Sequence, residues 1–286
     1  MSPGAAPGGA NPLPGHLLFS RWDNTTNTFA SHHVSRADGS EQTEIKMPGL
    51  YGPGRWSHSG KQIAVSVELG RDRVGTAIIN PKGDVLRVLT LPDKTLNMVC
   101  TVWSPDDRRL ACETWDASNP DRAGIYTVRA ADGKKMERLT SSSAGNQDLA
   151  GDYSPDGKNI VFRRTVDGDN GPLLVIPAGG GRPRQIADQV VEDSGRYSPD
   201  GETVVASTAG SIVFLNVATG EMVHRIAEEG HVLFGPSWSP DGTYVVYLNT
   251  LSGQHLGEIY MSHPDGSDTR NVTNSPESET VVEWGP

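Results

Sequence analysis

The side chains of this 286-residue sequence that are best suited to chemistry lie in short polar segments spread along the chain. The segments are "KMPGLYG", "LPDKTLNM", "TSSSAGNQD", "ADQVVED", "AEEGHVL" and "NSPESET". Their candidate ligand-binding residues are Tyr51, Asn97, Asp148, Glu192, Asp193, His231 and Glu279. Carboxylates grouped with a histidine can hold a metal ion, a cationic ligand or a basic peptide segment. That chemistry requires a fold that brings the segments together.

Motifs of known enzymes are absent from the sequence. "GRWSHSG" contains Ser57 and Ser59, but neither serine has a glycine two places away on both sides, so no nucleophile elbow is present. The sequence also lacks H-E-x-x-H and a phosphate-binding P-loop. "DGDNG" at 167–171 resembles the start of a calcium loop without its later ligands. These absences favour a protein that is not an enzyme.

A repeated turn phrase indicates which elements position the candidate residues. "WSPDG" at Trp238 recurs with variation at Trp56, Trp103, Tyr153 and Tyr197, and begins again at Trp284, at intervals of 47, 50, 44, 41 and 46 residues. Proline presets the backbone angle of a turn, aspartate bonds the local backbone, and glycine adopts the left-handed conformation that closes a hairpin. A strand-rich period in the forties predicts one repeated β unit per period.

Each unit continues with a short apolar strand, a turn and a fourth strand, as in "AGIYTVRAADGKKMERLT". Four antiparallel strands form a propeller blade. Residues 15–49 supply strands two to four of a blade, and the C-terminal "VVEWGP" supplies its first strand. We therefore expect an all-β protein with almost no helix: a six-bladed β-propeller whose ring closes where the N-terminal strand joins the C-terminal blade.

This topology predicts that the candidate residues share one face. The turn phrase links strands one and two at one end of each blade, so the loops entering strand one must lie at the opposite end, together with the loops between strands two and three. The latter loops add Trp22 and Trp115, each followed by an aspartate. Large aromatic residues in such loops are either binding anchors or lids over the core. We expect binding at this loop-lined mouth of the channel, and not at the turn-phrase face.

The turn phrase and the strand "IYTVRAADGKKMERLT" resemble the WD40-like (PD40) repeat of the TolB-type six-bladed propeller, over residues 15 to 286. The sequence departs from the repeat at His58, Ser59 and Asp107, which puts two turn conformations in doubt. The resemblance implies a fold and leaves several functions open, because similar propellers occur in periplasmic TolB, in prolyl-oligopeptidase-type peptidases and in stand-alone binding proteins.

Composition restricts the partners. The net charge of −10 disfavours nucleic acid, which requires a basic face, and no apolar run is long enough to span a membrane. Residues 1–14 are expected to be a flexible Pro/Gly-rich linker, and residues 15–286 a single propeller domain and a monomer. The linker is not a signal peptide.

The resemblance implies an extracytoplasmic (periplasmic, secreted or anchored) location, with a cytoplasmic one left open.

Cys100 and Cys112 are the two cysteines, and they lie in the strands that flank the second turn phrase. If the register places them opposite each other, they can form a cross-strand disulfide, whereas a slip of one residue would separate them. A pair of buried free thiols is the alternative. Their spacing does not suit a zinc site.

Three functions fit these observations. The first is a non-catalytic binding or scaffold propeller that recognises a protein segment or a small ligand at the loop-lined mouth and needs no cofactor. The second is a metal-assisted lyase or hydrolase that uses His231 with Asp148, Glu192 and Glu279 around a divalent metal in the channel. The third is an extracellular sensor module of a larger anchored protein. The first is the expectation that the sequence favours.

Overall fold

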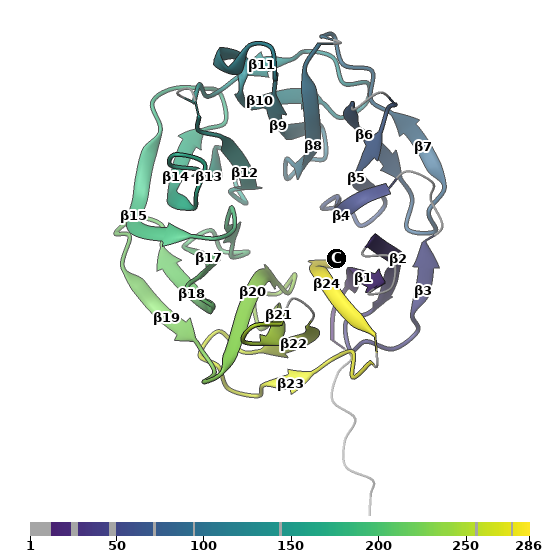
Figure 1. Ribbon diagram of the computed structural model, residues 1–286, viewed down its shortest axis with the longest axis vertical. Coiled ribbons are helices and arrows are strands. Elements are labelled where there is room, and N and C mark those ends of the chain that lie inside the picture. The colour runs from purple at the N-terminus through teal and green to yellow at the C-terminus, as the bar shows by residue number, and fades with distance from the viewer. Residues whose placement is uncertain are drawn as a thin grey trace, which may run out of the picture.

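A computed structural model of the protein describes residues 13–23, 28–45, 50–70, 73–93, 95–142, 145–254, 257–275 and 277–286, without the side chains of 28–30, 50–53 and 188–190. Within these residues the strands form six four-stranded antiparallel sheets. Figure 1 shows the sheets arranged as blades around a central opening. The predicted six-bladed all-β propeller is confirmed.

The first three blades follow the expected order of strands. Blade 1 contains β24 (Ser278–Gly285), β1 (His16–Asp23), β2 (Thr28–Arg36) and β3 (Thr43–Ile45). Blade 2 contains β4 (Leu50–Trp56), β5 (Ile63–Glu68), β6 (Val74–Ile79) and β7 (Val85–Val88). Blade 3 contains β8 (Asn97–Trp103), β9 (Arg109–Trp115), β10 (Gly124–Arg129) and β11 (Glu137–Arg138).

The other three blades repeat this order. Blade 4 contains β12 (Asp148–Tyr153), β13 (Asn159–Arg164), β14 (Gly171–Pro177) and β15 (Arg184–Val191). Blade 5 contains β16 (Arg196–Tyr197), β17 (Thr203–Thr208), β18 (Ser211–Asn216) and β19 (Met222–Ile226). Blade 6 contains β20 (His231–Trp238), β21 (Val245–Leu251), β22 (Glu258–Ser262) and β23 (Arg270–Asn271). The one helix in the described residues is a 3-10 turn, Pro120–Arg122, and it is not long enough to cross a membrane.

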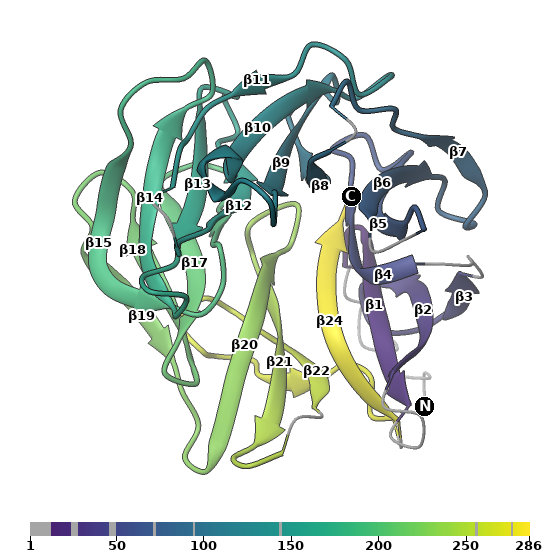
Figure 2. The same cartoon turned by 45° about the horizontal axis from the view of Figure 1, so that its top comes forward.

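The ring closes as predicted, by pairing of the two ends of the chain. β1 lies between β24 and β2 and pairs antiparallel with both, and Figure 2 shows β24 beside β1. Contacts begin just before β1, since the Trp284 indole N–H donates to the Pro14 carbonyl at 2.8 Å and Leu13 packs on the core. The expected linker therefore meets the ring at its last two residues, and its residues 1–12 lie outside the described residues.

The hydrophobic core is divided among the interfaces between blades. Six clusters of buried side chains occur in the described residues, and each contains residues from two neighbouring blades. For example, Ala64 and Ile78 of blade 2 pack against Met98 of blade 3. Because apolar burial is completed between blades, each blade depends on both neighbours.

The turn phrase is explained by hydrogen bonds within each hairpin. The Ser239 hydroxyl donates to Asp241 at 2.7 Å and accepts the Tyr244 N–H at 2.9 Å, while Gly242 has a left-handed φ of 72°. The same serine–aspartate bond recurs in three other copies, at Ser104–Asp106, Ser154–Asp156 and Ser198–Asp200. The repeated residues therefore encode the geometry of the turn.

The two hairpins whose sequences depart from the phrase still form the turn. Asp107, which stands in place of glycine, adopts a left-handed φ of 57°. Its carboxylate accepts the N–H groups of His58 at 2.8 Å and Ser59 at 3.0 Å in the neighbouring hairpin. The aspartate thus stabilises the other unusual turn, and the two substitutions compensate for each other.

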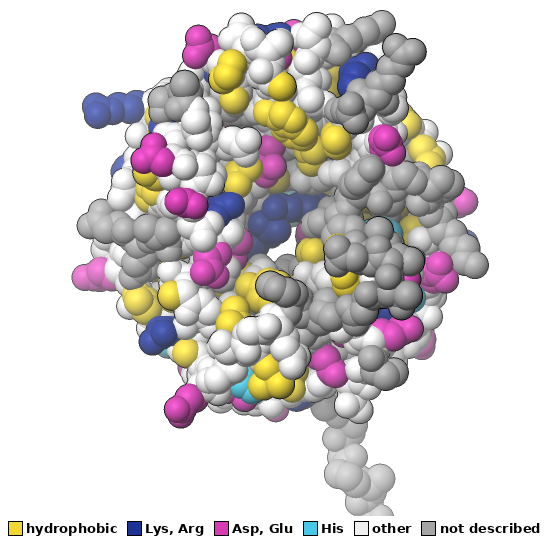
Figure 3. Space-filling model, in the orientation of Figure 1, with side chains coloured by type: hydrophobic (Ala, Val, Ile, Leu, Met, Phe, Trp, Pro, Cys, Tyr) yellow, Lys and Arg dark blue, Asp and Glu magenta, His cyan; other side chains and the backbone are white. Residues whose placement is uncertain are grey.

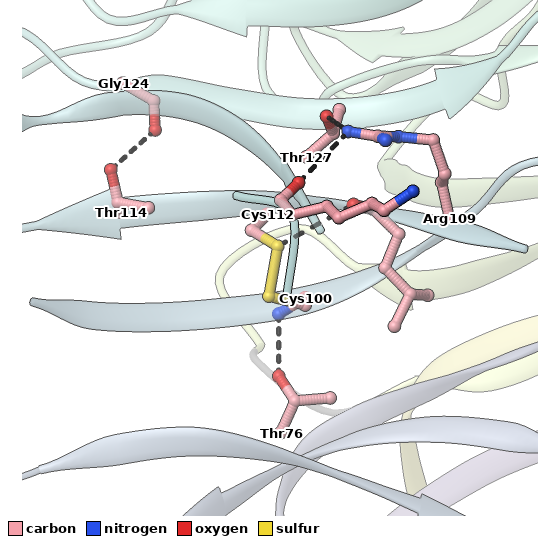
Figure 4. Close-up of a disulfide and its surroundings, with 9 residues drawn as sticks. Thr76, Cys100, Arg109, Cys112, Thr114, Gly124 and Thr127 are labelled. Carbon is pink, nitrogen blue, oxygen red and sulfur yellow. Dashed lines mark hydrogen bonds between the residues drawn. A yellow bond between two sulfur atoms is a disulfide. The ribbon is translucent and has the colours of Figure 1, made fainter. Parts of the chain in front are cut away.

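The cysteines are directly opposed and form a disulfide. Cys100 on β8 is the register partner of Cys112 on β9, and their sulfurs are bonded (Figure 4). Both side chains are fully buried, and the Cys100 N–H donates to the Thr76 hydroxyl of blade 2 at 2.7 Å. Of the two alternatives that the sequence leaves open, the structure has the cross-strand disulfide.

Candidate functional site

Two of the predicted carboxylates at the loop-lined mouth are buried in ion pairs. Asp148 binds Arg164 through two hydrogen bonds of 2.6 and 2.8 Å. Glu279 is fully buried, 3.4 Å from Arg21 Nε, and accepts a hydrogen bond from Thr273 at 3.1 Å. Burial raises the pKa of Glu279, while Thr273 and Arg21 lower it. These two carboxylates link strands within their blades and are buried, so neither is open to a ligand from solvent.

The two adjacent carboxylates before β16 have different surroundings: one is hydrogen-bonded within the protein and the other is exposed to solvent. Asp193 accepts the N–H and the hydroxyl of Ser207 at 2.8 and 2.7 Å, and burial raises its pKa. Glu192 is exposed, and its backbone N–H bonds the Ser207 carbonyl. Glu192 is therefore the one predicted carboxylate whose side chain is open to solvent.

His231 lies at the rim of a polar cavity of about 330 Å³ on the loop face of blade 6. Its Nδ1 is 2.7 Å from Asn249 Oδ1, and its Nε2 is 3.6 Å from Glu228. Glu258, Asn271 and Glu277 line the same cavity. None of the other predicted residues lines this cavity, so the carboxylates expected to form a metal site with His231 are not among its lining residues.

The remaining predicted residues lie at strand ends. The side-chain oxygen of Asn97 accepts the Val74 N–H at 3.1 Å, so it links blades 3 and 2. Trp22 and Trp115 are partly buried, at the ends of β1 and β9. The side chain of Tyr51 lies outside the described residues. Over the described ranges, no three His, Cys, Asp or Glu side chains are grouped so that they could hold a metal ion.

The opposite end of the channel contains a cavity of about 340 Å³ that sequence reasoning missed. We call it the turn-phrase funnel. All six blades contribute to its lining, through the phrase aromatics and prolines and through the residues before them. Figure 3, which views the ring from the loop-lined side, shows basic and acidic side chains in and around the central hollow. The lining of the funnel includes Arg55, Asp152, Arg196 and Glu283, so the funnel is a concave site on the axis with a charged base.

The charged base comes from one repeated position, the residue directly before each phrase aromatic. In blade order the six residues are Glu283, Arg55, Val102, Asp152, Arg196 and Ser237. The series acid, arginine, neutral residue thus occurs twice around the ring. In four blades an irregularity in the register of the inner strand directly precedes this position. Bulges of this kind re-aim side chains.

These residues also link the inner strands. Glu283 accepts the Trp56 N–H of the next blade at 3.2 Å, and Ser237 accepts the Trp284 N–H at 3.0 Å. Asp152 accepts the Tyr197 N–H in the same way, at 3.2 Å. Burial raises the pKa of Asp152 and of Glu283. The acids of the ring are therefore used in joining neighbouring blades.

Glu113 of β9 is a further, half-buried acid near this ring. Burial raises its pKa to about 7, although the charges of Arg55, Arg163 and Arg196 lower it. Since the ordinary value is 4.5, the folded protein holds this proton more tightly than the unfolded chain does. The contribution of Glu113 to stability therefore falls as pH rises from 4.5 to about 7.

Replacing Glu113→Gln should remove that dependence. We expect the variant and the native protein to differ little at pH 5, and the variant to be more stable by about 1 to 3 kcal/mol at pH 8. Urea unfolding at both pH values measures the difference. The exposed Glu221→Gln is the control, and an equal gain there at pH 8 would contradict the assignment.

Comparison with known proteins agrees with this architecture. A sequence profile of the TolB beta propeller domain (PD40) matches residues 33–286. An uncharacterized protein of Agrobacterium fabrum is 24% identical over 177 residues, which are 60% of this chain and 57% of that protein. The chain thus spans little more than half the length of that relative.

Solved structures show the same fold. TolB from Acinetobacter baumannii aligns with a TM-score of 0.73 at 20% identity, covering 96% of this chain and 68% of that one. A protein of Agrobacterium tumefaciens named as a TolB aligns with a TM-score of 0.68 at 16% identity, covering 96% and 99%. At these identities the likeness concerns the fold alone. The family profile covers most of the sequence, and the chain belongs to the TolB beta propeller domain family.

Proposed function

We propose that this propeller is a non-catalytic binding protein that recognises an extended segment of another protein at the turn-phrase funnel. The observation that carries the proposal is a cavity on the ring axis to which every blade contributes. Binding sites favour concave surfaces formed by several elements. The loop-lined mouth expected from the sequence remains an alternative position, because the His231 cavity lies on that face.

The shape of the surface favours an extended chain over a compact small molecule. A second cavity of about 320 Å³ lies between blades 5 and 6 and shares Ser198, Pro199 and Trp238 with the funnel. The two cavities are therefore adjacent, and the second one extends to the outer strand β19, where Val223 is exposed. Grooves lined by aromatic residues suit extended peptides.

The location is part of the same proposal. Kinship with TolB supports a place outside the cytoplasm, either as a free binding protein or as the sensor module of a larger anchored protein. Both forms would present the funnel to a partner.

Peptide selection tests the proposal. Peptides selected from a random library on the immobilised protein would be titrated while the fluorescence of the tryptophans is recorded. We expect Pro199→Glu, at the junction of the two cavities, to weaken binding by about tenfold or more, and His231→Ala to leave it unchanged. The reverse result would move the site to the loop-lined mouth. Insensitivity to both substitutions would reject a channel site.

A further inference from the structure

Two arginines from opposite blades meet at the base of the turn-phrase funnel. Arg55 belongs to blade 2 and Arg196 to blade 5, yet both Nη1 groups donate to the carbonyl of Gly151 in blade 4. Arg196 Nη1 also donates to the Gly195 carbonyl at 3.2 Å. Gly151 is required here, because a Cβ on it would lie 1.9 Å from the Ser194 carbonyl oxygen.

Acidic side chains surround these arginines, since the charges of Glu283, Asp152 and Glu113 raise the pKa of Arg55. Within the described part of the chain, however, no carboxylate forms a hydrogen bond with either guanidinium group. The nearest carboxylate oxygen to Arg55 is on Glu283, 3.8 Å from Nε, which is too long for a hydrogen bond. No described carboxylate forms an ion pair with Arg196. Glu283 and Asp152 instead accept backbone N–H groups of neighbouring blades. Two like charges thus share one neutral acceptor.

We propose that Arg55 and Arg196 form a carboxylate-binding site at the base of the funnel, which receives an acidic side chain or the C-terminal carboxylate of the bound segment. This inference rests on the proposed function, and it adds the chemistry that the segment must carry. A carboxylate between the two guanidinium groups would separate their charges and accept their remaining N–H donors.

The chemistry of the arginines supports this assignment. A guanidinium group has five N–H donors in a plane that matches a carboxylate, and the hydrogen bonds from Arg196 involve Nη1 alone. Burial and the nearby Arg196 lower the pKa of Arg55 to about 10. Arg55 therefore stays charged at neutral pH. Both side chains line the funnel, so a ligand can reach them.

Side-chain NMR of the full chain tests the site without a known partner. The probes are succinate, its neutral analogue succinamide, and a pentapeptide ending in glutamate together with its fully amidated twin. We expect succinate and the acidic peptide to shift the Nε–Hε signals of Arg55 and Arg196, and the neutral probes to bind about tenfold more weakly or worse. Arg196→Met and Arg55→Met should each abolish that preference, whereas the exposed Arg182→Gln should retain it.

Equal affinity for the acidic and neutral probes, or equal loss in the Arg182→Gln control, would overturn the inference. Melting curves of each variant establish that the fold is kept, and the signals of the native protein give the answer if a variant fails to fold. A funnel that binds the selected peptides in a Pro199-dependent way, with no preference for carboxylates, would refute this inference alone. If succinate binds but the Pro199→Glu substitution does not weaken binding of the selected peptides, the proposed function is refuted instead.

Discussion

A chain that begins at residue 24, and so lacks β1, is expected to lose its cooperative unfolding transition. β1 lies between β24 and β2, and its Leu17 and Phe19 are almost completely buried. Burying each such side chain contributes about 1.5 to 3 kcal/mol, and both edges of the opened sheet would lose their partners. The total loss approaches the whole stability of an ordinary domain, about 5 to 15 kcal/mol.

Urea unfolding followed by circular dichroism measures the effect. The matched control is a chain that begins at residue 13, which keeps β1 and the contacts of Leu13 and Pro14 with the ring. We expect the control to unfold in one sharp transition. If both chains unfold at the same urea concentration, ring closure by β1 does not contribute to stability.

The fold could be predicted from the sequence because local, repeated sequence patterns determine it. The Ser-Pro-Asp-Gly phrase determines a hairpin through contacts within a few residues, such as Ser239 with Asp241. Its period then gives the number of blades, and the incomplete units at the two ends give the closure. None of these steps requires knowledge of which side chains meet across the ring.

The site could not be predicted in the same way, because it depends on partners far apart in sequence. Asp148 is paired by Arg164, and Glu279 by Arg21, which is 258 residues away. Chain order predicts a loop near the mouth, but it does not show that a neighbouring strand neutralises the loop's carboxylate. The disulfide could not be predicted with certainty for a related reason. The register between β8 and β9 shifts just after Cys100, and whether the two cysteines lie opposite each other depends on where that shift occurs.

The charged residues around the channel could have been predicted from a pattern in the sequence. The pairs "RW", "DY", "RY" and "EW" place a charge directly before a phrase aromatic. A strand alternates its side chains between two faces, so a charge next to a buried Trp or Tyr points to the opposite face, which in the innermost strand meets the next blade beside the channel. What the sequence hides is that Arg55 and Arg196 reach the same carbonyl group from opposite blades.

Replacing Arg21→Met should destabilise the closing blade by about 3 to 5 kcal/mol, because it leaves the buried Glu279 carboxylate without its charged partner. Arg21 on β1 contacts Glu279 and Glu277, so it joins the two ends of the chain. Glu279 is fully buried at the ion pair, and its pKa is already raised by burial. Removing the guanidinium raises that pKa further, so the loss should grow as pH rises through the folded-state value.

Urea unfolding at neutral pH, with the substitution Arg36→Met beside it, gives the matched comparison. Arg36 lies in the same blade and pairs with Glu41, but both side chains are more than half exposed, so that change should cost less than about 1 kcal/mol. Adding Glu279→Gln to Arg21→Met should recover part of the loss, since a neutral amide is less costly to bury than an unpaired carboxylate. Equal losses for the two arginines, or no recovery in the double variant, would mean that burial of Glu279 is not the source of the effect.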